Sequence, residues 1–191
     1  MKRTLPFVAA ALMLGATTLQ ANEFEPAMRS YLETEVLTWA MDPVIVARIK
    51  EQNTAHASLD QAAIDAMDAQ WRKEVGAAAT PTIDPVVNNA ASDFLRDHVD
   101  GSVGIISEIF VMDAHGMNAA ASGITSDYWQ GDEDKFQQTF GVGPDAVHFG
   151  EVEFDESSQR FQAQLSITIR DPETGDAIGA MTVGLNAEAL M

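Results

Sequence analysis

Hydrophobic residues in the first half of the chain recur at the spacing of an α-helix. Between residues 25 and 40 the apolar side chains stand three or four positions apart, at Met28, Leu32, Val36 and Trp39, which predicts an amphipathic helix with these residues in the core. Further helices are predicted where capping signals precede the same spacing. These signals are Asp42-Pro43, the capping box Ser58-Leu59-Asp60-Gln61, and Asp84-Pro85, which opens a helix ending near residue 101.

After Gly101 the period changes to that of β-strands. The run at 103–113 is apolar on both faces, as in a central strand, and the run at 161–170 alternates strictly between apolar and polar residues. Turn signals set off three more strands at 117–122, 147–154 and 177–186, and a short helix is expected at 132–140. Because most of these strands are joined by hairpins, we expect a five-stranded antiparallel sheet behind a set of helices, an α+β fold.

The first residues have the order of a secretory signal peptide. A basic start, Lys2-Arg3, is followed by an apolar run at 5–14 and then by small and polar residues up to Ala21. The apolar run is too short to cross a bilayer, which needs about 20 residues, so no membrane insertion is expected. We expect cleavage after Ala21 and a mature chain, 22–191, in a bacterial periplasm.

Charge and cysteine usage narrow the class of protein. The chain carries a net charge of −18 and no cysteine, so no disulfide can form and an ordinary hydrophobic core must stabilise it. Acidic residues concentrate at 100–160, a stretch that contains twelve Asp and Glu residues but only two basic residues, Lys135 and Arg160. Such a surface repels phosphate backbones and anionic lipid heads, which argues against nucleic-acid and membrane-surface partners.

Catalytic and metal-binding patterns are not evident. The four histidines, at 56, 98, 115 and 148, have no metal-ligand spacing, and we expect neither a metal nor a cofactor. Carboxylates could in principle form an acid/base pair, as in glycoside cleavage, but no spacing selects a pair. We therefore expect a binding protein rather than an enzyme, with a hydrolase using paired carboxylates as a less favoured alternative.

Two hairpins resemble those of a known family. The stretch 109–122, with its turn Asp113-Ala114-His115-Gly116, resembles the first hairpin of Cache domains, which are PAS-like extracytoplasmic sensor domains. The stretch 171–184 looks like their last hairpin, and SDYWQGDEDKF, residues 126–136, is similar to single-Cache periplasmic proteins. The resemblance covers about residues 84–190. It divides the chain into the signal peptide 1–21, a helical N-terminal segment 22–83 and a sensor domain 84–191.

The resemblance implies a fold and a role. It implies an N-terminal helix on one face of a five-stranded sheet and a small-molecule pocket on the other. The role would be to bind small ligands for a signalling system. Most Cache domains lie between transmembrane helices, which are not evident here, so we expect a soluble binding protein that reports to a separate membrane receptor, histidine kinase or chemoreceptor. An accessory protein that docks on such a sensor without binding a ligand is the alternative.

The stretch at 126–136 supplies the candidate ligand-binding residues, which are Ser126, Asp127, Tyr128, Trp129 and Asp132. Aromatic faces attract cations, and a nearby carboxylate would pair with an ammonium or guanidinium head, so a small polar molecule, with a cation favoured, is the expected ligand. Gly131 would let the backbone fold closely around it, and the polar face of the strand at 161–170 would add hydrogen bonds from Gln164, Ser166 and Thr168. The alternative is that Tyr128 or Trp129 closes the core beneath the loop.

Overall fold

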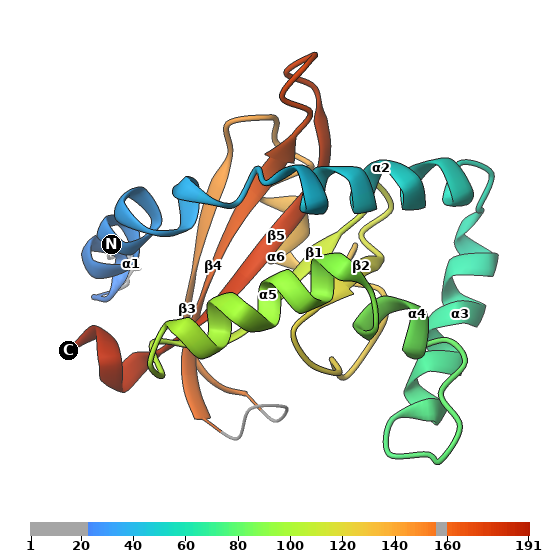
Figure 1. The fold of residues 1–191 in the computed structure, drawn as a ribbon, viewed down its shortest axis with the longest axis horizontal. Coiled ribbons are helices and arrows are strands. Elements are labelled where there is room, and N and C mark those ends of the chain that lie inside the picture. Colours follow the sequence, from blue (N-terminus) through green and yellow to red (C-terminus); the bar gives the residue numbers. More distant parts are fainter. Residues whose placement is uncertain (1–22, 156–159) are drawn as a thin grey trace, which may run out of the picture.

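The computed structural model describes residues 23–155 and 160–191 (Figure 1). The predicted signal peptide and most of the predicted turn after Asp155 lie outside the described residues. The helices are α1 (Glu25–Thr34), η1 (Val36–Thr38), α2 (Pro43–His56), α3 (Gln61–Glu74), α4 (Asp84–Val87), α5 (Ala90–Gly101), α6 (Asp134–Gln137) and η2 (Ala187–Leu190). The strands are β1 (Ile106–Met112), β2 (Asn118–Ala121), β3 (Val147–Asp155), β4 (Arg160–Arg170) and β5 (Ala177–Asn186).

The strands form one antiparallel sheet in the order β2-β1-β5-β4-β3. The first and last strands therefore pair at the middle of the sheet, and β2 and β3 lie at its edges. The α+β fold with a PAS-like five-stranded sheet, predicted from the sequence, is confirmed.

One face of the sheet carries the main hydrophobic core. Helices α1, α2 and α5 cover this face (Figure 1). Alternate residues of β4, such as Leu165 and Ile167, pack against helical residues such as Ile49 and Leu95. The strict alternation of β4 puts Gln164, Ser166 and Thr168 on the opposite face, which the long connection between β2 and β3 covers.

The helices are shorter than the periodicity predicts. The first predicted helix ends at Thr34, because Glu35 leaves helical geometry, and Trp39 is only partly buried. The predicted capping box is wrong, since Asp60 is the cap and accepts from the Ala63 backbone N–H at 2.9 Å. The helix predicted from Asp84 breaks at Asn89, whose side chain caps α5 by accepting from the backbone N–H of Ser92.

Boundaries also move in the second half of the chain. The predicted strand at 103–113 begins only at Ile106, because Val103 and Gly104 both adopt positive φ and form a turn. The predicted helix at 132–140 is a single turn, α6. Within residues 23–155 and 160–191, no helix has both the length and the apolar character needed to span a membrane.

A second, smaller core lies beside the β2 edge of the sheet. Helices α3 and α4 stand there, on the right of Figure 1. Their buried residues Ile64, Trp71, Ile83 and Val86 form one cluster with Met117 and Tyr128. The helical N-terminal segment therefore packs directly on the stretch that the sequence analysis singled out.

Candidate functional site

A cleft of about 760 Å³ opens between the β2–β3 connection and the polar face of β3 and β4. Its floor includes Gln162 and Gln164 of β4, and Ser126 lies on the opposite wall. A smaller chamber of about 100 Å³ lies beside it and reaches Phe110 of β1. The two spaces share Ser126, Glu133, Lys135 and Gln164, so they adjoin; the smaller one, on the side of β1, is called the inner chamber.

The floor of the cleft is polar and largely held in place by the protein. Gln162 accepts from the Ser107 hydroxyl at 2.5 Å and donates to Glu108 at 2.9 Å. This network occupies the space above Gly184, where a Cβ would lie 2.6 Å from Oε1 of Gln162. Gln164 faces both spaces, and within the described residues its side chain makes no hydrogen bond to the protein. Gln164 is therefore the floor group available to a ligand.

The other two polar residues predicted on this strand are already satisfied. Ser166 shares a hydrogen bond with Thr182 at 3.0 Å, and Thr168 donates to the carbonyl of Gly143 at 2.7 Å. Both are buried. Ser166 therefore links β4 to β5 and Thr168 links β4 to the connection, and neither lines the cleft.

The cleft is strongly acidic. Five carboxylates line it, at Asp132, Glu133, Asp134, Glu151 and Glu153, against one ammonium, at Lys135. Only Glu133 is paired, at 2.9 Å from Lys135. In the part of the chain that the structure describes, the other four carboxylates have no ion-pair partner within 4 Å. The negative charge of the cleft is therefore mostly uncompensated.

Lys135 lies where the two spaces meet. Its Nζ is 2.9 Å from Oε2 of Glu133, 3.2 Å from Oε1 of Gln130 and 5.4 Å from the centre of the Phe110 ring. Its side chain is 15% exposed. The ammonium is thus held by a carboxylate, an amide oxygen and an aromatic face at once.

Three of the predicted site residues border these spaces. Ser126 and Asp132 line the cleft, and Asp127 lines the inner chamber with Ser126. The Asp127 carboxylate accepts from the Gln130 side chain at 2.6 Å and lies 3.4 Å from the Arg72 guanidinium. Asp127 is therefore already engaged by the protein, whereas Asp132 is not.

The two aromatic residues lie elsewhere. Tyr128 is 4% exposed and stacks on Trp71 with ring centroids 5.0 Å apart, and burial, followed by the charge of Asp113, raises the pKa of its phenol to about 12. The Trp129 indole N–H donates to the carbonyl of His115 at 2.9 Å. Neither residue lines the cleft or the chamber. Tyr128 is core, which was the alternative, and the two rings form no cage around the cleft.

Asp68 of α3 explains why a Tyr-Trp pair occurs in a polar loop. Its carboxylate accepts from the backbone N–H groups of Tyr128, at 2.9 Å, and Trp129, at 3.1 Å. Arg72 donates to the same carboxylate at 2.7 Å. We call these bonds to Asp68 the Asp68 clamp. Gly131 lies so close to the indole that a Cβ would be 2.4 Å from Nε1 of Trp129. The loop is therefore held by α3, and Gly131 packs against Trp129 rather than against a ligand.

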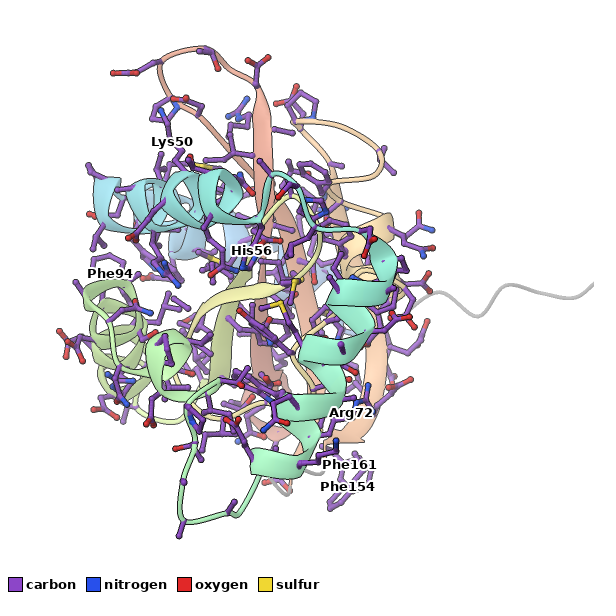
Figure 2. The ribbon with its side chains drawn as sticks, turned by 90° about the vertical axis from the view of Figure 1, so that its right-hand side faces the viewer. Lys50, His56, Arg72, Phe94, Phe154 and Phe161 are labelled. Atoms are coloured by element: carbon purple, nitrogen blue, oxygen red, sulfur yellow. The ribbon has the colours of Figure 1, made fainter. Side chains whose placement is uncertain are left out.

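The Asp-x-x-Gly turn has a structural role of the same kind. Asp113 is fully buried, and one of its oxygens accepts from the backbone N–H groups of His115 and Met117 at 2.9 and 3.0 Å. The other oxygen lies 2.6 Å from Nδ1 of His56 and 3.0 Å from Nε2 of Gln52. Both partners come from the end of α2 (Figure 2). The turn and α2 are therefore tied together.

Sequence reasoning missed the far wall of the cleft. Glu151, Glu153 and Phe154 belong to β3, where the register shifts between Phe149 and Val152. A bulge of this kind cannot be read from alternation, because it changes which residues face the cleft. Phe154 is 51% exposed and packs edge-to-face on Phe161, with centroids 5.4 Å apart (Figure 2). Because Phe154 pairs across the strands with Phe161 while Glu153 pairs with Gln162, this ring pair lies at the edge of the sheet on the face opposite the floor of the cleft.

Comparisons by sequence find no relative. No protein-family model matches the chain, and no curated protein matches it. Within the described residues, no group of three or more His, Cys, Asp or Glu side chains is arranged to hold a metal ion.

Several solved structures are similar to the chain. The ligand-binding domain of a Campylobacter jejuni chemoreceptor in complex with 4-methylisoleucine is 12% identical, with a TM-score of 0.43, over 87% of this chain and 61% of that one. The sensor domain of the V. cholerae histidine kinase DctB is 13% identical, with a TM-score of 0.42, over 86% and 57%. The ligand-binding domain of the Pseudomonas aeruginosa amino acid chemoreceptor PctC in complex with GABA is 13% identical, with a TM-score of 0.43, over 86% and 61%.

These structures are sensor or ligand-binding domains of chemoreceptors and a histidine kinase. The chain spans between 57% and 61% of their length. At this low similarity the likeness concerns the course of the chain, and the ligands in those structures say nothing of the ligand of this one.

Proposed function

We propose that the chain is an exported ligand-binding sensor domain whose cleft takes a small polar cation. The observation that carries the proposal is the charge of the cleft, where four carboxylates without a partner, Asp132, Asp134, Glu151 and Glu153, surround a space of about 760 Å³. All four are exposed, and like charges around one cleft attract a cation more strongly than a single carboxylate does. An ammonium or guanidinium head is such a cation.

The proposed contacts follow from the positions of the side chains. Asp132 and the β3 carboxylates would pair with the charged head, and Gln164 and Ser126 would hydrogen-bond to the rest of the ligand. Asp127, Tyr128 and Trp129 would act indirectly, by holding the loop that carries Ser126 and Asp132.

Export and signalling complete the proposal. The predicted signal peptide, with cleavage after Ala21, would deliver the mature chain to the periplasm, and a separate membrane receptor, histidine kinase or chemoreceptor would read the liganded form.

Thermal melting of the chain 22–191 with amines, guanidines, amino acids and organic acids tests the proposal. A ligand present at a hundred times its Kd adds about 2.7 kcal/mol to the free energy of unfolding and raises the melting temperature by several degrees. A response to cations that is lost in Asp132→Asn or Glu153→Gln would support the proposal.

The matched control is Glu33→Gln, which removes the same charge from an exposed position on α1, away from the cleft. It should leave the response intact. A response confined to organic acids would contradict the cationic ligand, and no response to any compound would contradict the binding function and favour an accessory protein without a ligand.

A further inference from the structure

Lys135 lines the inner chamber, and its ammonium is held there in the manner of a bound ligand. Its ammonium contacts a carboxylate, an amide oxygen and an aromatic ring, which belong to Glu133, Gln130 and Phe110. These are the three kinds of group that bind ammonium ions in proteins. We propose that Phe110, Gln130 and Glu133 form a subsite for a primary ammonium group, that Lys135 fills it when the cleft is empty, and that the ligand displaces Lys135. This inference rests on the proposed function.

Two members of the subsite are fixed without Lys135. Phe110 is 2% exposed and packs in a small core with Met112 and Phe136. Gln130 is also 2% exposed, its backbone N–H donates to the carbonyl of Gly116 at 2.8 Å, and its side-chain amide donates to Asp127 at 2.6 Å. That last bond leaves the Gln130 carbonyl oxygen facing the chamber. The subsite is therefore preformed and would persist if the lysine left.

The position of Lys135 would allow its side chain to move out of the subsite. It lies on α6, a single turn of helix in the connection that covers the cleft, and Glu133 immediately precedes that turn with a 38% exposed side chain. The chamber opens directly into the cleft through the residues that they share. A displaced Lys135 could turn toward the partner-free carboxylate of Asp132 or Asp134, which would offset the loss of its pairing with Glu133.

The size of the chamber limits the ligand. The chamber measures about 100 Å³ with Lys135 in its wall, against about 760 Å³ for the cleft. Displacing Lys135 would add the volume of one alkylammonium group, so the chamber would take only one end of a molecule that the cleft would hold whole. A primary ammonium on an unbranched alkyl chain can enter as the lysine side chain does. A quaternary ammonium cannot, because it has no N–H to give to Glu133 and Gln130. The structure thus selects primary alkylamines among cations.

Chemical rescue of Lys135→Ala tests the subsite. This variant leaves the chamber open and Glu133 unpaired, so propylammonium chloride should raise its melting temperature and should half-saturate at a concentration about tenfold or more below that for the wild-type chain, in which the tethered lysine competes. Two probes of similar size, 1-propanol and tetramethylammonium, should have no such effect. Adding Glu133→Gln to the variant should abolish the response.

Two further variants separate the subsite from a general charge effect. Lys73→Ala removes an exposed lysine from α3, outside the cleft, and should show no response to propylammonium beyond that of the wild type. Lys135→Met keeps the alkyl stem in the chamber and should respond more weakly than Lys135→Ala. Equal responses to propylammonium and 1-propanol, or equal responses of Lys135→Ala and Lys73→Ala, would overturn the inference.

The outcomes also separate this inference from the proposed function. If the wild-type chain binds cations and Lys135→Ala binds propylammonium no better, the subsite is wrong and the cationic cleft stands. If Lys135→Ala binds propylammonium while the wild-type chain binds no compound of the panel, the subsite is real and the sensor function fails. If neither protein binds any cation, both are wrong.

Discussion

The rings of Trp71 and Tyr128 lie face to face, with centroids 5.0 Å apart and planes 12° from parallel. Trp71 belongs to α3 and Tyr128 to the connection that covers the cleft, so the stack joins the helical half of the chain to the wall of the candidate site. The indole N–H of Trp71 donates to the carbonyl of Thr125 at 2.9 Å, which adds a second link between the same two segments.

Removing the Tyr128 ring should therefore reduce stability more than it reduces ligand affinity. We expect Tyr128→Ala to lower the free energy of unfolding by about 3–5 kcal/mol, the range for losing a large core side chain. Tyr128→Phe keeps the stack and should cost much less. Urea unfolding measures both variants. If Tyr128→Phe instead abolished binding while stability held, the phenol would belong to the ligand site.

The clamp made by Asp68 gives a graded prediction. Asp68→Ala leaves the backbone N–H groups of Tyr128 and Trp129 without their acceptor, which should lower the free energy of unfolding by about 1–3 kcal/mol. Asp68→Asn keeps an oxygen acceptor and should lose less. The comparison uses denaturant midpoints of the two variants, and an equal loss in both would assign the effect to the ion pair with Arg72 instead.

Substitution of Asp113 should lower the free energy of unfolding more than most other substitutions in the chain. Asp113→Ala removes a fully buried carboxylate and leaves the His115 and Met117 N–H groups unpaired, so we expect a loss of about 3–5 kcal/mol. His56→Ala removes one partner from the rim of the same network and should lose less. Both are measured by chemical unfolding at neutral pH. A mild effect of Asp113→Ala would mean that water replaces the lost oxygen.

Stability should depend on pH through His98. Burial lowers the pKa of its imidazole, and the charges of Asp97 and Asp42 oppose this only in part. Because the folded state takes up the proton less readily than the unfolded state, the stabilisation is complete above the unfolded pKa of about 6.5 and is lost as pH falls through that value toward the lower folded pKa.

His98→Phe provides the comparison. It retains a ring against Trp39, which stacks on His98 with centroids 4.2 Å apart, but cannot be protonated. Melting temperatures of the wild type between pH 7.5 and 5.0 should fall more steeply than those of the variant. Parallel curves would show that His98 does not contribute.

Gly131→Ala should disturb the loop without touching the cleft floor. The added Cβ would lie 2.4 Å from Nε1 of Trp129 and 2.9 Å from the His115 carbonyl, so the indole must move and give up its hydrogen bond. We expect a loss of about 1–3 kcal/mol, as for overpacking elsewhere, together with a shift in tryptophan fluorescence. Gly123→Ala is the matched control, since its Cβ would meet nothing within 4 Å.

Much of the fold could be predicted from the sequence, because the spacing of apolar residues and the residues that form turns depend on neighbours along the chain. Strand β5 matches its predicted bounds, and Asp42 and Pro43 open α2 as expected. Several errors fall where a side chain accepts from the backbone three residues further on, at Asp60 and Asn89, or where a bulge interrupts alternation in β3. Others fall where the backbone turns earlier than the apolar pattern indicates, at Glu35 and Val103. Such choices depend on which competing hydrogen bond forms, and the pattern of apolar residues does not encode this.

The candidate site was predicted only in part, for a related reason. Ser126 and Asp132 line the cleft, but neighbouring residues in a loop point in different directions, and the sequence could not show that Tyr128 turns toward Trp71. The carboxylates of β3 lie some twenty residues further on, and only the folded sheet brings Glu151 and Glu153 opposite the loop. The cation–π contact between Lys135 and Phe110 also joins residues far apart in the sequence, so the sequence alone could not predict it.

The strand order has a consequence for how the chain can be made. Strand β1 pairs with β5, and β2, β3 and β4 lie between them in the sequence, so the middle of the sheet cannot close until all five strands have been synthesised. Until then β1 has only the short β2 beside it. A chain interrupted before β5 would therefore lack the centre of the sheet rather than its edge, and β1 would be left unpaired on one side and open to association with other chains.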